Sequence, residues 1–107
     1  MGALGEFEEV VLLSVLRLAG EAYSVAVREE IRVRAHRGVT RGALFTALDR
    51  LEEKGLLSSR MGEPLPERGG RARRFFRVTA QGLSALRASR RARMDLWQGL
   101  ETVLGEP

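Results

Sequence analysis

The 107-residue sequence contains no cysteine, a single lysine and no long hydrophobic run. Without cysteine the chain has no disulfide framework, no thiolate chemistry and no cysteine-based zinc site. Its longest apolar stretch lies within residues 10–16, which is far shorter than the roughly 20 residues that cross a bilayer. We therefore expect neither a membrane span nor a signal peptide, and we expect a cytoplasmic protein.

Acidic residues are missing from one stretch of the chain. Between Gly70 and Met94 there are eight arginines and no Asp or Glu, although the net charge of the whole chain is only +4. Codon bias in a GC-rich genome explains 17 arginines beside one lysine, but it does not explain the absent acids. Residues 1–31 instead hold six acids and two arginines. Charge sorted in this way indicates a polyanionic partner, most commonly duplex DNA, because arginines that neutralise phosphates release condensed counterions.

Residues suited to enzyme chemistry are also scarce. No serine has a plausible histidine partner, no spacing predicts a metal site, and no glycine loop is suited to phosphate. The sole histidine, His36, lies in a basic turn, and we interpret it as a loop or capping residue. We expect no catalytic residue, no metal and no cofactor, and we predict that the protein is not an enzyme.

The length fits one small domain, which would gain stability from oligomerising. Helical spacing predicts a first helix over residues 5–18, in which apolar residues cover two faces. One helix with two apolar faces needs two partners. A second helix is expected after Ser24, its predicted N-cap, with Val25, Val27 and Ile31 as its apolar residues.

The third predicted helix spans about residues 41–54, begins at the N-cap Thr40 and ends at Gly55. Asp49 on its exposed surface favours an ordinary core helix, because a carboxylate facing phosphates is unfavourable unless it accepts from cytosine or pairs with Arg50. The wing that follows favours a helix that docks on DNA. Its predicted buried stripe consists of Leu44, Ala47, Leu48 and Leu51.

Two short strands are predicted next, over residues 56–61 and 72–78, with a loop rich in glycine and proline between them. On the second strand, alternation predicts that Phe76 and Val78 face the core and that the other face is strongly basic. Thr79 begins a final helix that we expect to run to about residue 104. A helix projecting so far beyond a small core needs another chain to cover it.

This order of elements is that of a winged helix-turn-helix protein, mainly α with a small β-wing. Two segments resemble motifs of the PadR family of bacterial transcriptional regulators: residues 42–57 read GALFTALDRLEEKGLL, and residues 70–79 read GRARRFFRVT. The resemblance covers roughly residues 4–104. Phe45 and Thr46 stand where the family typically has tyrosine and proline.

The resemblance implies two parts, as in the short subgroup of the family. Residues 1–79 would form a winged-helix DNA-binding domain, with the recognition helix at about 41–54 and the wing at about 57–78. Residues 80–107 would form a C-terminal dimerisation helix.

The resemblance also makes a double-stranded DNA operator the expected partner and the chain a sequence-specific regulator, namely a homodimeric repressor of an inverted repeat. The recognition helix would enter the major groove, with Arg41 near phosphates or guanine edges and Thr46 at base edges. Wing arginines would follow the backbone or enter the minor groove, although a basic edge that prevents strand pairing is the alternative. The expected DNA-binding residues are Thr40, Arg41, Gly42, Phe45, Thr46, Arg50, Arg71, Arg73 and Arg74.

The first and last helices are expected to build the dimer. Trp97 is assigned chiefly to this interface; the resemblance also implies a small aromatic effector that stacks on Trp97, as in some short PadR relatives. Mid-helix arginines (Arg87, Arg90, Arg91 and Arg93) are either a solvated face or partners for the acidic first helix of a second subunit. The expected interface residues are Phe7, Val11, Leu83, Met94, Trp97, Leu100 and Leu104.

Two other interpretations stay open. A different type of winged-helix regulator would bind an operator in the same way and sense a different signal. A winged-helix module could instead bind RNA through its basic face, or a protein partner through its apolar faces, without operator specificity. Sequence-specific, salt-sensitive binding to duplex DNA separates the first two interpretations from the third.

Overall fold

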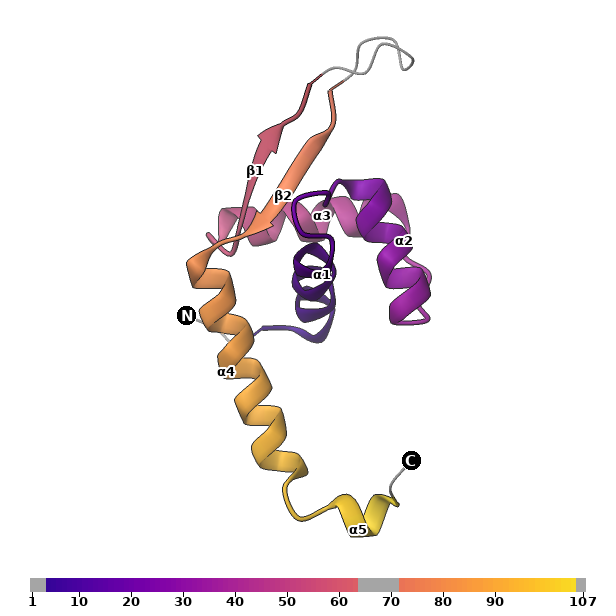
Figure 1. Ribbon diagram of the computed structural model, residues 1–107, viewed down its shortest axis with the longest axis vertical. Coiled ribbons are helices and arrows are strands. Elements are labelled where there is room, and N and C mark those ends of the chain that lie inside the picture. The colour runs from indigo at the N-terminus through magenta and orange to yellow at the C-terminus, as the bar shows by residue number, and fades with distance from the viewer. Residues whose placement is uncertain (1–3, 64–71, 106–107) are drawn as a thin grey trace.

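The computed structural model describes residues 4–63 and 72–105 of the chain. Over these residues three helices are followed by a two-stranded antiparallel sheet and two further helices (Figure 1). The fold class expected from the sequence, mainly α with a small β-wing, is confirmed. The elements are α1 (Glu6–Arg17), α2 (Ser24–Arg34), α3 (Arg41–Glu53), β1 (Leu57–Met61), β2 (Arg74–Val78), α4 (Ala80–Trp97) and α5 (Glu101–Leu104).

Helix α1 lies at the centre of the body, where it contacts α2, α3, β2 and α4. The stripe predicted for α3 is buried against it, as are Phe76 and Val78 of β2, so these predictions are confirmed. Val11 of α1 is fully buried in the same core. Its side chain is therefore unavailable to a second subunit, which corrects the expectation that Val11 lies in a dimer interface.

The two predicted threonine caps are present. The Thr40 hydroxyl accepts a hydrogen bond from the Ala43 N–H at 3.1 Å and so begins α3. The Thr79 hydroxyl accepts from the Gly82 N–H at 3.0 Å and donates to the Gly55 carbonyl at 2.6 Å, which ties the start of α4 to the end of α3. Each cap satisfies an N–H that has no partner inside its helix.

Helix α2 begins differently from the prediction. Tyr23 is its N-cap residue and Ser24 is its first helical residue, because Tyr23 is held in an isolated antiparallel bridge with Phe75 of β2. The neighbouring Phe76 N–H also donates to the Ala22 carbonyl at 2.8 Å. Val25 lies about 200° around the helix from the buried Val27 and is 58% exposed.

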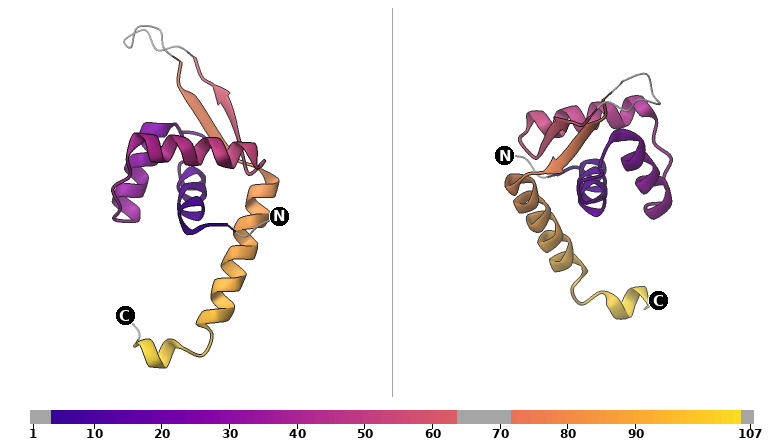
Figure 2. Two further views of the ribbon diagram at one scale, coloured as in Figure 1. Left: turned by 180° about the vertical axis from the view of Figure 1, so that it is seen from behind. Right: turned by 45° about the horizontal axis from the view of Figure 1, so that its top comes forward.

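The wing is a hairpin in which β1 and β2 pair in register from Leu57 opposite Val78 to Met61 opposite Arg74. Its outer strand face carries Arg77, which is exposed, and Phe75, which is half-buried. The hairpin extends from the helical body at the end opposite α5 (Figures 1 and 2).

The last predicted helix is wrong in its length. Helix α4 ends at Trp97, Gln98 leaves the helical conformation, and Gly99 adopts a φ of 85° before the four-residue α5. A positive φ is accessible to glycine at little cost, so the single glycine ends the helix. Helix α4 projects from the body, and all described residues from 90 to 105 are exposed (Figure 2).

Candidate nucleic-acid interface

The first turns of α3 present several of the residues expected to bind DNA. Arg41, Gly42, Phe45, Thr46 and Arg50 are all exposed, while the opposite stripe of the helix is buried in the core. The N-terminal N–H groups and the positive end of the helix dipole point toward the same exposed end. The stripe predicted to be buried is buried, whereas Asp49, which was expected on the exposed surface, is half-buried.

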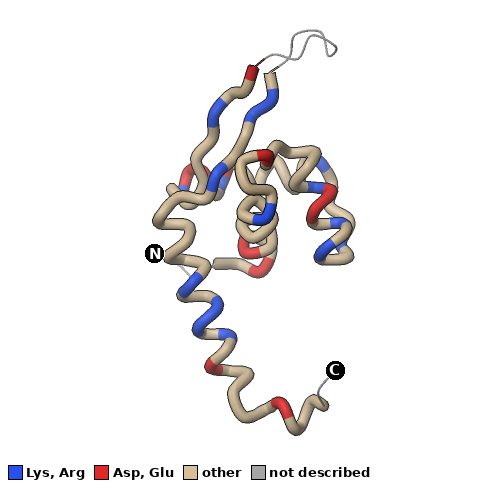
Figure 3. Tube along the Cα trace, in the orientation of Figure 1, with Lys and Arg blue, Asp and Glu red and all other residues tan. Residues whose placement is uncertain are grey.

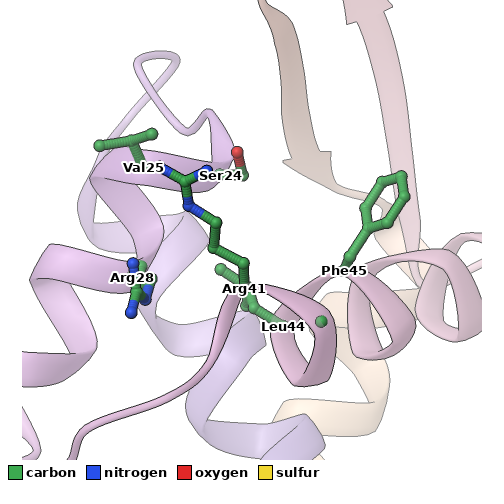
Figure 4. A pocket seen from close by; sticks show the side chains of 7 residues that line it. Ser24, Val25, Arg28, Arg41, Leu44 and Phe45 are labelled. Atoms are coloured by element: carbon green, nitrogen blue, oxygen red, sulfur yellow. The ribbon is translucent and has the colours of Figure 1, made fainter.

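A hollow of about 400 Å³ lies between the start of α2 and the start of α3. Figure 4 shows Val25 and Phe45 on its two sides, with the Arg41 side chain extending from α3 toward α2. Arg28 also lines it, and its Nε donates to the Val39 carbonyl oxygen at 2.5 Å. Among the described residues Arg41 forms no ion pair. None of the seven lining residues is acidic, so this hollow has a cationic and partly apolar lining.

A second hollow, of about 560 Å³, lies on the other side of α3, beside the start of α1. Thr46 and Arg50 line it together with Glu6 and Glu8. A hydrogen bond from the Lys54 ammonium, at 2.5 Å, holds the pKa of the Glu8 carboxyl below its ordinary value, and the nearby Arg50 also lowers it. The structure therefore separates Thr46 and Arg50 from Arg41 and Phe45, and it places the first pair next to acids.

Gly42 lines both hollows, which puts it on the crest of α3 between them. A Cβ atom at this position would meet no other atom within 4 Å. The glycine is therefore not required for packing within the chain. The absence of a side chain there leaves the backbone open to close approach from outside.

The side chain of Arg74 is directed toward α3 and is engaged there by acids. It shares the inward side of β2 with Phe76, and its guanidinium group lies 4.8 Å from the centre of the Phe76 ring. Its Nη2 pairs with Glu52, and its Nη1 lies 3.3 Å from Asp49 Oδ1, both on α3. Because two carboxylates engage Arg74, we interpret it as a residue that holds the wing on α3, and the expectation that it contacts DNA stays a prediction. Asp49 is thereby paired with Arg74, not with Arg50.

At the base of the wing, Arg73 lies over an aromatic ring. Its guanidinium group is 4.2 Å from the centre of the Tyr23 ring, which meets Phe75 edge-on at 5.7 Å. On β1, Arg60 lies 4.8 Å from the centre of the Phe75 ring. Stacking on a ring leaves the N–H groups at the guanidinium edge free to donate to phosphate. Arg71 lies outside the described residues.

Two of these positions were not among the expected site residues. Arg60 is brought beside Phe75 by strand pairing, and only the register of the hairpin could have revealed it. Val25 was expected as an apolar helix residue, whereas its exposure beside Arg41 follows from how α2 sits on the body. Figure 3 shows basic residues along both strands of the wing and along α4.

The residues expected in a dimer interface fall into separate places. Phe7 lines the hollow beside α3, with the Arg37 guanidinium 4.9 Å from its ring centre. Leu83 of α4 instead lines a hollow of about 450 Å³ together with Leu13 and Leu16 of α1. Those two leucines belong to the second apolar face of the first helix, and both are exposed. The remaining interface candidates are also exposed: Met94, Trp97, Leu100 and Leu104.

One of the α4 arginines, Arg93, has a partner within the same chain. Arg93 Nη2 pairs with Glu9 Oε1 of α1 at 2.8 Å, and Arg87 and Arg90 line the hollow that Glu9 also borders. The expectation of pairing with the first helix of a second subunit is thus corrected for Arg93.

Other types of site gain no support from the described ranges 4–63 and 72–105. No group of three or more His, Cys, Asp or Glu residues there is placed to hold a metal ion. No helix within these ranges is both long and apolar enough to cross a membrane. His36 lies in the loop between α2 and α3, as expected.

Comparison with solved structures gives the same arrangement of elements. A PadR family transcription regulator from Clostridium difficile is 21% identical, with a TM-score of 0.73 over 92% of this chain and 99% of that chain. A PadR family transcriptional regulator from Eggerthella lenta is 25% identical, with a TM-score of 0.69 over 95% and 88%. A PadR-like transcriptional regulator from Bacillus cereus is 16% identical, with a TM-score of 0.73 over 94% and 93%.

A comparison with curated proteins found no match. The model of the transcriptional regulator PadR-like family matches residues 12–88, which is most of the chain and includes α2, α3 and the wing. The chain is therefore a member of the PadR-like family of transcriptional regulators, and this membership supports a DNA-binding regulator.

Proposed function

We propose that the chain is a homodimeric repressor that binds an inverted-repeat operator, with the start of α3 in the major groove and the wing against the backbone. The observation that carries the proposal is the exposed, capped N-terminal end of α3, which displays Arg41, Gly42 and Phe45 beside a basic wing. Such a regulator acts on chromosomal DNA, so we also propose that it works in the cytoplasm.

Electrostatics supports DNA as the ligand of this surface. Two of the three acids of α3, Asp49 and Glu52, are engaged by Arg74, and the third, Glu53, is the last residue of the helix, far from its N-terminal end. Arg41 has no such partner among the described residues, and Arg73 is fixed over Tyr23 at the base of the wing. Both arginines can neutralise phosphates, which gives affinity and orientation. Contacts to base edges would give specificity.

Exposed apolar side chains support a dimer. Leu13 and Leu16 on α1 lie near Leu83 on the inner part of α4, and further apolar residues extend along α4 and α5. Apolar surface on this scale marks an interaction site. A second copy of the chain would cover both regions, and its two-fold symmetry would place two α3 helices about one turn of DNA apart. Trp97 stays our candidate for stacking a small aromatic effector in that dimer.

Genome-fragment selection with the purified protein, followed by footprinting at several salt concentrations, tests the proposal. We expect a protected palindrome whose half-sites lie about one helical turn apart, and repression of a reporter placed behind it. Weak, sequence-blind and salt-labile retention would contradict the proposal and favour an RNA or protein partner.

Sedimentation of wild-type protein and of Leu100→Asp tests the dimer. The substitution places a charge in the proposed interface, so we expect a monomer that still folds, because Leu100 is exposed in the single chain. Glu101→Gln in the same segment serves as the control. A wild-type monomer at micromolar concentration would contradict the dimer.

A further inference from the structure

Two large apolar side chains stand exposed at the start of α2 and α3. Val25 is 58% exposed and Phe45 is 57% exposed, and both line the hollow of about 400 Å³ described above (Figure 4). They lie apart from the apolar surface of α1, α4 and α5, to which the proposed dimer is assigned. Because both side chains border one hollow, they form apolar surface that a partner entering the hollow would cover.

The chemistry of the hollow selects the partner. Arg28 and Arg41 line it beside the apolar pair, and no acid does. Apolar side chains on both sides of a hollow that cations also line complement a surface that combines anions with apolar groups. Duplex DNA has this combination in its major groove, where phosphates border the base edges.

Phe45 cannot read a base by hydrogen bonding, because a phenyl ring has neither a donor nor an acceptor. Among the groups that base pairs display in the major groove, the C5-methyl group of thymine is the apolar one. A phenyl ring on the first turns of a recognition helix therefore discriminates bases through that methyl group. Val25, across the hollow from Phe45, offers a second apolar contact to the same or a neighbouring thymine.

We propose that Phe45, assisted by Val25, recognises thymine methyl groups in each operator half-site, while Arg41 and Arg28 hold the adjacent phosphates. This inference rests on the proposed function of operator binding and adds how part of the operator is recognised. Thymine carries this methyl group and uracil lacks it, while the two bases present the same hydrogen-bonding groups. Replacing thymine by uracil therefore removes the methyl contact and keeps the hydrogen-bonding groups of the base.

Uracil interference provides the test. The duplexes recovered by genome-fragment selection are prepared with random partial replacement of thymine by deoxyuridine, and bound and unbound fractions are compared after cleavage at uracil. With wild-type protein we expect specific positions in each half-site at which uracil weakens binding, by about fourfold for each methyl group that is covered.

The variants assign that effect to residues. Phe45→Ala should bind thymine and uracil duplexes equally at the sensitive position, and Val25→Ala should reduce the difference there. Val33→Ala is the matched control, since Val33 lies at the other end of α2, is 51% exposed and does not line the hollow. It should keep the wild-type pattern. Thermal unfolding of each variant verifies that the fold is intact.

Three results would overturn the inference. A specific footprint without any uracil-sensitive position would refute methyl recognition and leave operator binding intact. An unchanged uracil effect in Phe45→Ala would place the methyl contact elsewhere. Failure to recover any specific duplex would refute the proposed function itself, and the inference with it.

Discussion

Arg74 on β2 and Glu52 on α3 form an ion pair that joins the wing directly to the recognition helix. The two side chains are 34% and 31% exposed, and the same guanidinium group also engages Asp49 at 3.3 Å and the Ser59 hydroxyl at 3.2 Å. One arginine thus ties the wing to α3 and pairs with two acids of that helix. We therefore predict that the pair acts on DNA binding through the position of the wing and not through a contact of its own.

We predict that Arg74→Ala lowers the free energy of unfolding by about 1–3 kcal/mol, because partly buried hydrogen-bonding groups lose their partner. It should also weaken DNA binding, since Asp49 and Glu52 would then repel phosphates. Chemical denaturation and DNA titration measure the two effects. In a double-mutant cycle, adding Glu52→Gln should restore part of the lost affinity. If Arg74→Ala leaves stability unchanged and only lowers affinity, then Arg74 contacts the DNA directly and our assignment is wrong.

We predict opposite effects on stability when two glycines, Gly42 and Gly82, are replaced by alanine. At Gly42 a Cβ atom meets nothing within the chain, so Gly42→Ala should raise the free energy of unfolding by up to about 1 kcal/mol through helix propensity. Close approach of DNA to the same backbone should make this stabilised variant bind about tenfold more weakly, on the order of the cost of one mismatched base pair. Unchanged affinity would show that the crest of α3 stays clear of the duplex.

At Gly82 the added atom would overlap the Leu56 carbonyl oxygen and lie 2.7 Å from Val78 Cγ1. Helix α4 would have to move away from the sheet to accommodate it. Gly82→Ala should therefore destabilise the fold by about 1–3 kcal/mol, as measured by chemical denaturation. A stability equal to wild type would show that the start of α4 packs more loosely than the structure has it.

Local patterns predicted most of the fold because they depend on neighbours in sequence. The caps at Thr40 and Thr79, the stripe of α3 and the inward side chains of β2 all follow from short-range spacing. The break after α4 depends on one glycine inside an otherwise helical pattern, and a single glycine is usually tolerated in a helix. Spacing alone could not decide whether Gly99 would end the helix or be accommodated within it.

The candidate site was predicted less completely, because its geometry depends on tertiary contacts. Arg74 looked like one more wing arginine until strand register placed it over Asp49 and Glu52. Val25 was expected as one of three apolar residues of α2, and only the packing of α2 on the body shows that Val27 and Ile31 are buried while Val25 is exposed. Charge counts identify a basic region, but pairing decides which of its cations are free.

Acid should abolish one contact between α1 and the end of α3. The hydrogen bond from Lys54 holds the pKa of Glu8 below its ordinary value in the folded chain. A lowered folded-state pKa adds stability above the ordinary pKa, and this stability is lost as the pH falls through the lowered value. Glu8→Gln should therefore destabilise the protein near neutral pH, and the difference from wild type should begin to shrink at the ordinary pKa of a glutamate and vanish only below the lowered pKa of Glu8.

Chemical denaturation of both proteins across this pH range measures the effect. Glu101→Gln is the control, since Glu101 is exposed on α5 and forms no ion pair among the described residues. A difference between Glu8→Gln and wild type that persists unchanged in acid would refute the role of the Glu8 charge.

The salt dependence of DNA affinity tests whether the wing contacts phosphates. Each phosphate contact contributes about 0.9 to the slope of log affinity against log salt concentration. Replacing Arg71 and Arg73 together by alanine should weaken binding to operator and random duplex alike and flatten the slope by up to about 2. Thr46→Ala should instead mainly reduce discrimination between them. The control is the double variant Arg34→Ala with Arg91→Ala, which removes the same charge far from the wing. Its slope should stay near that of wild type. If the two double variants gave equal slopes, the loss of net charge, and not the loss of wing contacts, would explain the flatter slope.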